Sequence, residues 1–354
     1  MKIAIIGTRG IPNRYGGFEQ FAQHLSEELS TNHEITVFNP HYRKDTSNYW
    51  KSVKIEKALC PRILGPLGHI IYDYVSLKKA LNSGNDVVLV CGYVSSYFAL
   101  WRFKKYKNRI LVHMDGFEWK RAKWWPIIRH IIKYIERNTV MLMPHLVTDH
   151  PFLEQYFMDT YQKKVHQIAY GCKLREVIIN NNKHIDKPYF LVIARNEKEN
   201  NIEMICRAFI AADIDAYLMI FTNKKFKVNS PKIKVWLNEY DDTILNFYRS
   251  KALAYVHAYT VGGTNPSLIE SMAYCSTIIA LKNDFHQYLL ENNALYFNDE
   301  NDLKEIMKKL IHNKKLHLHL ESNRKKIESY FQWHQIAQQY LCLFNEMLNE
   351  EESK

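Results

Sequence analysis

The stretch HAYTVGGTNPSLIESMAYCSTIIAL, residues 257–281, places a polar loop with a glycine pair between two apolar segments. The segment before the loop, residues 252–256, carries no charge, which predicts a buried strand. Residues 277–281 form a second short apolar run of the same kind. The order of strand, glycine loop, helix start and strand is typical of an α/β protein with a parallel sheet.

A helix start is predicted directly after the glycine pair. Asn265 or Ser267 can serve as the N-cap, and Pro266 is suited to the first turn. Glu270 follows Ser267 at the spacing of a capping box. The pattern therefore predicts a helix that begins near residue 266.

The glycine loop and the helix start are together suited to bind an anion. The first turn of a helix carries free N–H groups and a partial positive charge, and Gly262 and Gly263 allow a ligand close to the backbone. The alternative is structural: the glycines only turn the chain, and Glu270 only caps the helix. The local pattern leaves both interpretations open.

A second loop with paired glycines lies near the N-terminus. Residues 2–7 predict a first strand and residues 18–29 an amphipathic helix, with Gly16 and Gly17 directly before the helix. Ligands of such a β–α–β unit bind at the carboxyl edge of the sheet. The pattern G-x-G-x-x-G is absent, and residues 34–39 end without an acid for a ribose, so we exclude a dehydrogenase. An ordinary β–α loop remains the alternative to a phosphate site.

Residues 109–113 predict a buried strand that ends in a histidine, His113. Substrates of parallel sheets bind at the carboxyl ends of the strands, so His113 is a candidate functional residue, although a lone histidine is more often structural. Asp115 follows in the loop HMDGFEWKR. It either orients His113 or is an ordinary loop acid.

The composition is that of a folded protein with an anionic partner. The chain has 354 residues, enough for two domains, with 47% hydrophobic and 24% charged residues. Its formal net charge of +11 favours nucleotide phosphates, anionic lipids or nucleic acid as partners. The positive residues are dispersed and no nucleic-acid-binding motif is present, which argues against nucleic acid. No uncharged apolar run reaches about 18 residues, so no transmembrane helix is predicted.

Residues 120–138, KRAKWWPIIRHIIKYIERN, predict a basic helix with an apolar stripe. The stripe comprises Trp124, Ile128, Ile131 and Ile135. The helix either packs this stripe against the sheet and exposes its basic face, or lies on an anionic membrane surface.

Three blocks of the chain resemble one enzyme family. They are IIGTRGIPNRYGGFEQFAQHL (residues 5–25), HMDGFEWKRAKW (113–124) and VGGTNPSLIESMA (261–273), in that order. Together they are similar to the retaining glycosyltransferases of family 4, and most closely to its bacterial branch of polysaccharide rhamnosyltransferase-like proteins. The resemblance extends from Met1 to about Asn298.

The resemblance implies an α/β fold of the GT-B type, with two Rossmann-like α/β domains that face a cleft. We expect an acceptor-side domain over residues 1–172 and a nucleotide-sugar-binding domain over residues 173–332. A C-terminal helix over residues 333–354 is expected to return to the first domain.

The resemblance also assigns roles to residues at matching positions. His113 would contact the donor sugar, Arg195 the diphosphate and Glu270 the ribose hydroxyls. Asn200 stands where many members have a lysine. Gly262 stands where many have a glutamate, so the sugar pocket lacks a charged acceptor and suits a deoxysugar such as rhamnose. The expected catalytic residues are His113 and Asp115. The expected donor-binding residues are Gly16, Gly17, Arg195, Asn200, Gly262, Gly263, Thr264, Asn265, Pro266, Ser267, Leu268 and Glu270.

The implied activity is that of a retaining glycosyltransferase that needs no metal ion and no cofactor and acts in surface polysaccharide biosynthesis. It would move a sugar, with rhamnose a candidate, from a nucleotide-diphosphate sugar to a lipid-linked or oligosaccharide acceptor. The leaving diphosphate would deprotonate the acceptor on the same face, which retains the configuration. We expect a cytoplasmic protein, with the inner face of the cell membrane as a candidate attachment surface. Another GT-B enzyme, such as a nucleotide-sugar 2-epimerase, is the alternative.

Overall fold

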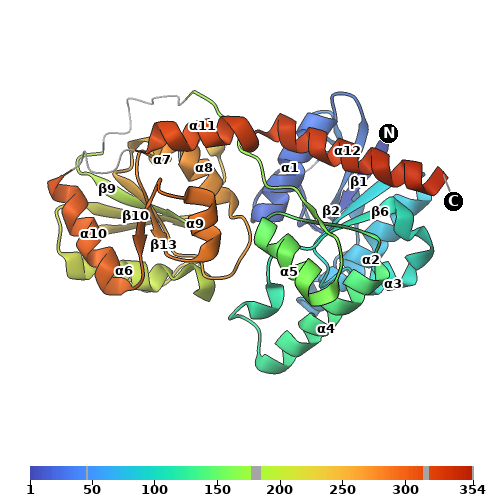
Figure 1. Cartoon of the computed structure of the whole chain (residues 1–354), viewed down its shortest axis with the longest axis horizontal. Coiled ribbons are helices and arrows are strands. Elements are labelled where there is room, and N and C mark those ends of the chain that lie inside the picture. Colours follow the sequence, from blue (N-terminus) through green and yellow to red (C-terminus); the bar gives the residue numbers. More distant parts are fainter. Residues whose placement is uncertain (45–46, 177–184, 314–318, 353–354) are drawn as a thin grey trace. The chain divides into compact units, whose positions relative to one another are not determined.

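The computed structural model describes residues 1–44, 47–176, 185–313 and 319–352, and the chain divides into two compact units. The first unit comprises Met1–Lys120, Trp124–Tyr170 and Trp333–Lys354, and the second comprises Arg121–Lys123 and Gly171–Gln332. Each unit is a mainly parallel β-sheet covered by helices (Figure 1). The prediction of two α/β domains is therefore confirmed.

The sheet of the first unit has a Rossmann-like core. Its strands are β1 (Lys2–Ile6), β2 (Glu34–Pro40), β3 (Tyr49–Trp50), β4 (Val53–Ala58), β5 (Val87–Cys91), β6 (Ile110–His113), β7 (His145–Thr148) and β8 (His166–Gln167). Their order is β3-β4-β2-β1-β5-β6-β7-β8, and all neighbours pair in parallel except β3 with β4. The strand order reverses between β1 and β5, which is where Rossmann folds bind ligands.

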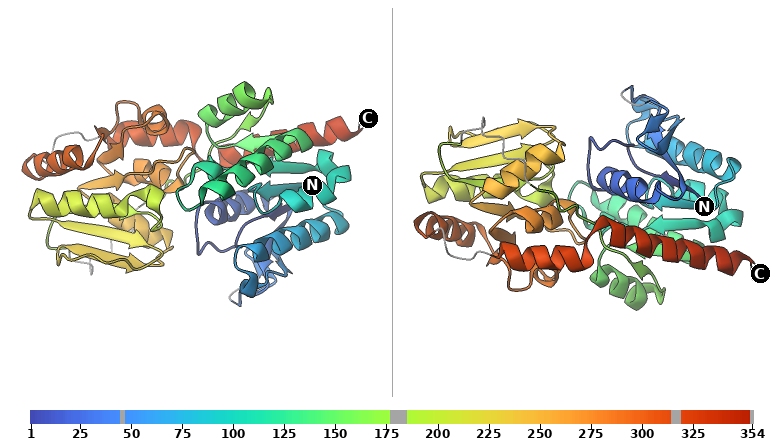
Figure 2. Two further views of the ribbon diagram at one scale, coloured as in Figure 1. Left: turned by 90° about the horizontal axis from the view of Figure 1, so that it is seen from below. Right: turned by 90° about the horizontal axis from the view of Figure 1, so that it is seen from above.

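Helices lie on both faces of the first sheet (Figure 2). They are α1 (Gly17–Leu29), α2 (Leu67–Asn82), α3 (Tyr97–Arg102), α4 (Pro126–Leu142), α5 (Pro151–Tyr161) and α12 (Trp333–Glu352). Helix α1 packs beside α12, where the ring centres of Phe21 and Tyr340 lie 5.5 Å apart. Helix α4 begins at Pro126 instead of the predicted Lys120. Proline is favoured at a first helical position, and it keeps the preceding residue, Trp125, extended.

The sheet of the second unit is wholly parallel. Its strands are β9 (Tyr189–Ile193), β10 (Tyr217–Thr222), β11 (Ile233–Leu237), β12 (Ala254–His257), β13 (Ile278–Leu281) and β14 (Leu295–Phe297). The order is β11-β10-β9-β12-β13-β14, so it reverses between β9 and β12. The strands predicted on either side of the glycine loop are found as β12 and β13, with starts shifted by one or two residues.

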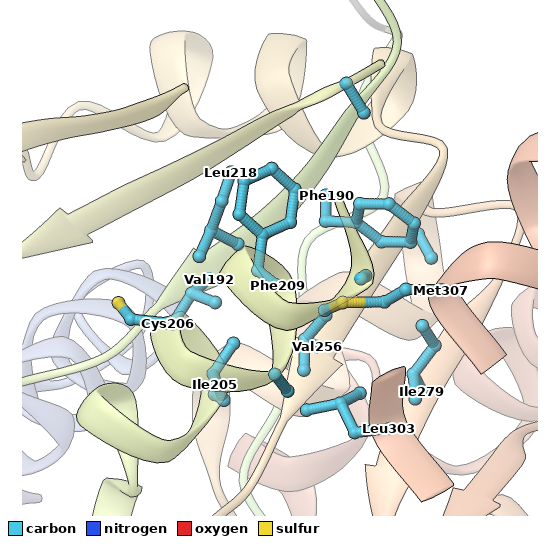
Figure 3. Close-up of a cluster of buried hydrophobic side chains, with 14 of the residues drawn as sticks. Phe190, Val192, Ile205, Cys206, Phe209, Leu218, Val256, Ile279, Leu303 and Met307 are labelled. Atoms are coloured by element: carbon cyan, nitrogen blue, oxygen red, sulfur yellow. The ribbon is translucent and has the colours of Figure 1, made fainter. Parts of the chain in front are cut away.

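The core of the second unit lies where two helices cover one face of the sheet (Figure 3). The helices of this unit are α6 (Ile202–Ala212), α7 (Asp242–Lys251), α8 (Pro266–Tyr274), α9 (Asp284–Leu290), α10 (Glu300–His312) and α11 (Leu320–Tyr330). Phe190 and Val192, alternate residues of β9, pack with Phe209 of α6 and Met307 of α10. This packing fixes the strands whose carboxyl ends carry the candidate site.

Candidate active site

Two predicted binding segments meet at the point where the strand order of the second sheet reverses. Arg195 follows β9 by two residues, and Gly262 and Gly263 lie in the loop after β12. Strands β9 and β12 are neighbours and run parallel, so both loops leave the same edge of the sheet. In open α/β sheets this edge, at this reversal, is where ligands bind.

Hydrogen bonds tie the two loops together. Both the backbone N–H and the hydroxyl of Thr260 donate to the carbonyl oxygen of Glu199, at 3.0 and 3.3 Å. The side-chain amide of Asn201 donates to the carbonyl oxygen of Ala258 at 2.8 Å. These bonds join residues about 60 positions apart, so the folded sheet brings the two loops of the candidate site together.

Asn200 organises the loop that presents Arg195. Its side-chain amide is buried and donates to the carbonyl oxygen of Arg195 at 2.8 Å. The backbone N–H of Glu197 donates to the same oxygen, also at 2.8 Å. The loop is therefore held in a tight turn, with the Arg195 side chain half-buried at the edge of the sheet.

Helix α8 starts with Asn265 as its N-cap. Its side-chain oxygen accepts the N–H of Ser267 at 3.0 Å, and its carbonyl oxygen accepts the N–H of Leu268, also at 3.0 Å. The expectation of free N–H groups at Ser267 and Leu268 is therefore wrong, and Pro266 has none to offer. What remains for an anion at this helix start is the partial positive charge of the helix dipole.

Glu270 does not take part in a capping box, because Asn265 rather than Ser267 caps the helix. Its carboxylate instead forms an ion pair with Arg249, which comes from α7. Arg249 is among the largest fully buried side chains of the protein. Sequence reasoning missed Arg249, because it lies on a separate helix and no local spacing connects it with Glu270.

The two positions of the loop are glycines for different structural reasons. Gly263 has a φ of +115°, a conformation that other residues rarely adopt. A Cβ atom on Gly262 would lie 2.0 Å from Cζ of Phe285, so the aromatic ring occupies the space that a side chain would need. Thr264, the next residue of the loop, is buried.

Two buried histidines beneath this loop were not predicted. His257 ends β12, and its ring centre lies 4.8 Å from that of His286 in α9. Burial lowers the pKa of His286 to about 4 and holds the pKa of His257 well below its usual range, so both rings are neutral. The hydroxyl of Tyr255 lies 3.0 Å from Oγ of Ser267 and joins this group to the start of α8.

In the first unit, His113 lies at the carboxyl end of β6, as predicted. The ring is completely buried and is surrounded by aromatic side chains. It stacks on Tyr170 with 5.8 Å between ring centres and meets the edges of Phe18 and Phe21. Burial lowers the pKa of His113 to about 3, so the imidazole is neutral.

The backbone of Asp115 orients this histidine. The N–H of Asp115 donates to Nδ1 of His113 at 3.1 Å, which leaves the ring proton of the neutral imidazole on Nε2. Nε2 has no hydrogen-bond partner among the described residues. Asp115 has a φ of +56°, an unusual conformation that brings its N–H to the ring.

Gly16 and Gly17 lie at the start of α1, with Gly16 as the N-cap. The loop before them is held by Asn39, the penultimate residue of β2, which is completely buried. The Asn39 side chain donates to the carbonyl oxygen of Ile11 at 2.7 Å and accepts the N–H of Ile11 at 3.0 Å. Asn39 thus stabilises the loop, and it stands near the end of the second strand, where a dehydrogenase would carry the acidic residue that binds the ribose.

Comparisons with known proteins agree with this architecture. Residues 1–173 match a family described as a domain of unknown function (DUF1972). No curated protein matches the chain. Sucrose-phosphate synthase from Thermosynechococcus elongatus is a similar solved structure, with a TM-score of 0.83, 15% identity and coverage of 99% of both chains.

Two further structures are similar over nearly their whole length. HepE from Anabaena, solved in complex with UDP, has a TM-score of 0.69 and 12% identity, covering 98% of this chain and 100% of that one. A glycosyltransferase from Rickettsia africae has a TM-score of 0.67 and 13% identity, covering 98% of both chains. The chain therefore has the GT-B fold of these glycosyltransferases, with two Rossmann-like α/β domains.

Within the described residues, no helix combines the length and the apolar character needed to cross a bilayer. The same residues bring together no group of three His, Cys, Asp or Glu side chains suited to hold a metal ion.

Proposed function

We propose that this protein is a retaining glycosyltransferase that takes a sugar from a nucleotide-diphosphate sugar and transfers it to a lipid-linked or oligosaccharide acceptor in surface polysaccharide biosynthesis. The observation that carries the proposal is the group of residues at the strand reversal of the second sheet. Arg195, the glycine loop and the start of α8 lie at that edge, and Glu270 follows in the second turn of α8, where it pairs with Arg249. Such a set offers positive charge for a diphosphate and a carboxylate for sugar hydroxyls.

The diphosphate would lie between Arg195 and the start of α8. An arginine can form two parallel hydrogen bonds with phosphate oxygens, and the helix dipole adds a partial positive charge. Gly262 and Gly263 let the phosphates approach the backbone of the loop. These groups would neutralise the leaving diphosphate, so the proposed reaction needs no metal ion.

The ribose would bind to Glu270. The ion pair with Arg249 positions its carboxylate, and 13% of the Glu270 side chain is exposed. Losing this carboxylate should weaken donor binding by about 1–3 kcal/mol. HepE, a similar structure, was solved in complex with UDP, which supports a nucleotide as part of the donor.

In the proposed reaction the bond between the anomeric carbon and the phosphate oxygen breaks, and the acceptor oxygen bonds to that carbon on the same face. The acceptor proton passes to the leaving diphosphate. His113 is the proposed contact of the donor sugar, and the N–H of Asp115 at Nδ1 fixes the ring proton on Nε2. Asp115 would therefore act as a positioning residue.

The donor would be a sugar with few hydroxyls to satisfy, such as rhamnose. Gly262 offers no side chain, and the ring of Phe285 fills the space beside it. An aromatic ring favours contact with a methyl or C–H face over contact with a hydroxyl.

We further propose that the protein acts in the cytoplasm and attaches to the inner face of the cell membrane through α4. Ile131 of the predicted apolar stripe is 50% exposed, and Trp125 and Ile127, which lie at the start of the helix outside the stripe, are 80% and 74% exposed. Exposed apolar residues on a basic helix fit an anionic membrane surface.

The function is tested by donor binding and product analysis. UDP-, dTDP- and GDP-sugars are screened by thermal shift against the wild type, Arg195→Gln and Glu270→Gln, with Arg324→Gln and Glu321→Gln as exposed controls on α11. We expect one nucleotide class to raise the melting temperature of the wild type and the controls, with the shift lost in the two site variants. A wild type that responds to no donor, or site variants that respond fully, would contradict the proposed site.

Product analysis then separates the reactions. Incubation with the bound donor and a lipid-linked saccharide should give a glycoside with the anomeric configuration of the donor, read by NMR coupling constants. An epimerised nucleotide sugar formed without any acceptor would instead favour the 2-epimerase.

A further inference from the structure

The carboxyl edge of the first sheet carries a surface that is both basic and apolar. Strands β1, β2 and β4 run parallel side by side, so the loops after them leave the same edge. The loop after β1 carries Arg9, and residues 59–67, LCPRILGPL, follow β4. The edge is the one at which β6, two strands beyond β1, presents His113.

The basic part consists of two exposed arginines. The guanidinium of Arg62 lies 4.1 Å from the ring centre of Tyr42, and that of Arg9 lies 3.7 Å from the ring centre of Tyr15. Within the described parts of the chain, neither arginine forms an ion pair with a carboxylate. Burial raises the pKa of Tyr42, and the charges of Arg9 and Arg62 both oppose that rise. The two guanidinium groups are therefore both close enough to Tyr42 to form one positively charged area.

The apolar part consists of four side chains between the end of β4 and the first residue of α2. Leu59, Ile63, Leu64 and Leu67 are 50%, 94%, 43% and 62% exposed. Single exposed apolar residues are common, but four within nine positions form a patch of the kind that binds a partner.

This loop is anchored at both ends, so the exposure of its apolar side chains is built into the fold. The N–H of Cys60 donates to Nδ1 of His41 at 2.9 Å. Gly68 lies so close to the backbone of Pro61 that an added Cβ would be 2.4 Å from its carbonyl oxygen. Between these anchors Ile63 projects on a single turn, Arg62–Leu64.

We propose that this surface binds the lipid phosphate that anchors the acceptor, with the phosphate at the two arginines and the hydrocarbon chain along the apolar side chains. The proposal rests on the proposed function and adds the chemical class of the acceptor. We call the surface the lipid-phosphate site, and its residues are Arg9, Leu59, Arg62, Ile63, Leu64 and Leu67. A single ligand with an anionic head and an apolar chain matches both parts of the surface, whereas a free sugar phosphate would leave the apolar part uncovered.

The test uses farnesyl phosphate as a soluble probe, with farnesol and inorganic phosphate for comparison, and isothermal titration of the full-length protein without donor. Farnesyl phosphate should bind, and each half-ligand should bind at least about tenfold more weakly, because each makes only part of the contacts. We expect binding of farnesyl phosphate to weaken about tenfold in each of the variants Arg9→Gln, Arg62→Gln and Ile63→Asn. This is the effect of losing one charged hydrogen bond or one buried apolar side chain. Arg324→Gln and Ile210→Asn, at exposed positions of the second unit, should bind like the wild type.

The outcomes separate this inference from the proposed function and from other partners. A wild type that shows a donor thermal shift but does not bind farnesyl phosphate overturns the lipid-phosphate site and leaves the transferase standing. Binding to phosphatidylglycerol vesicles that depends on the same residues, without farnesyl phosphate binding, assigns the surface to the bilayer and also overturns it. Concentration-dependent dimerisation lost in Ile63→Asn would assign the surface to a second copy. An unchanged donor shift in each variant shows that it is folded.

Discussion

The guanidinium of Arg249 forms a buried ion pair with the carboxylate of Glu270, and the pair joins helices α7 and α8. Only 1% of the Arg249 side chain is exposed, and its Nη1 also donates to Oδ1 of Asn246 at 2.8 Å. Burial is the largest single effect and lowers the pKa of Arg249, but the negative charge of Glu270 together with smaller contributions from Tyr255, Cys275 and Asp242 raises the pKa above its usual value. Arg249 of α7 thus orients the Glu270 carboxylate, which is the group proposed to bind the ribose.

Breaking this pair should destabilise the fold. Arg249→Met leaves the Glu270 carboxylate without its cation in a largely buried place, and we expect a loss of about 3 kcal/mol in the free energy of unfolding. The double variant Arg249→Met/Glu270→Met should recover most of that loss, because apolar side chains of similar volume replace both charges. Urea denaturation at pH 7 measures both, with Lys251→Met on the same helix as control. Equal stability of the single and double variants would show that the charges are not coupled.

The contact between Gly262 and Phe285 should make position 262 intolerant of any side chain. We expect Gly262→Ala to cost about 1–3 kcal/mol, because the ring must move to admit a methyl group. Adding Phe285→Ala should remove most of this cost, since it frees the space. Urea denaturation of the wild type, both single variants and the double variant gives the coupling energy. Additive effects of the two substitutions would contradict the packing described here.

Asp73, a buried residue of α2, should make stability depend on pH. Burial raises the pKa of its carboxyl group from 3.8 to about 7, partly offset by a hydrogen bond with Ser95. The folded protein therefore holds this proton over a pH range in which the unfolded chain has lost it. The contribution of Asp73 to the free energy of unfolding is fully present below about pH 4 and is lost as pH rises to about 7.

Asp73→Asn keeps the shape of the side chain without a titrating proton. We expect the variant to be more stable than the wild type at pH 7.5, on the order of a few kcal/mol, and to lose the difference as pH falls toward 4. Urea denaturation at several pH values measures this difference. A stability difference that stays constant from pH 4 to 7.5 would show that Asp73 titrates normally.

Asn39 should control the order of the loop that carries Gly16 and Gly17. Asn39→Ala leaves the N–H and the carbonyl oxygen of Ile11 without partners, and we expect a loss of about 2–3 kcal/mol. The freed loop should also be cut faster by trypsin at Arg9 and Arg14. Limited proteolysis and urea denaturation measure both effects, and Asn32→Ala, at an exposed position, is the control. A stable variant with the wild-type cleavage rate would rule out this role for Asn39.

Much of the fold followed from local patterns. The strands before and after the glycine loop, the helix start at Pro266 and the strand that ends in His113 were all predicted close to their observed positions. Each rests on an uninterrupted apolar run or on a capping residue a few positions away, so the information lies within one segment. No strand or helix was predicted for residues 41–85, which contain β4 and α2. Several apolar residues of this segment are exposed in the loop after β4, so they do not follow the pattern of a buried strand or helix face.

The partners of the site residues followed from tertiary structure alone. The ion pair of Glu270 with Arg249, the ring of Phe285 over Gly262 and the hold of Asn39 on Ile11 each join segments at least 20 positions apart. No local spacing encodes such a pair, because it forms only when the sheet and its helices bring distant segments into contact. The sequence by itself determined which of these segments became strands and helices, and it predicted which loops are suited to bind an anion. The packed fold decided which buried groups orient those loops, because burial and close contact exist only in the assembled structure.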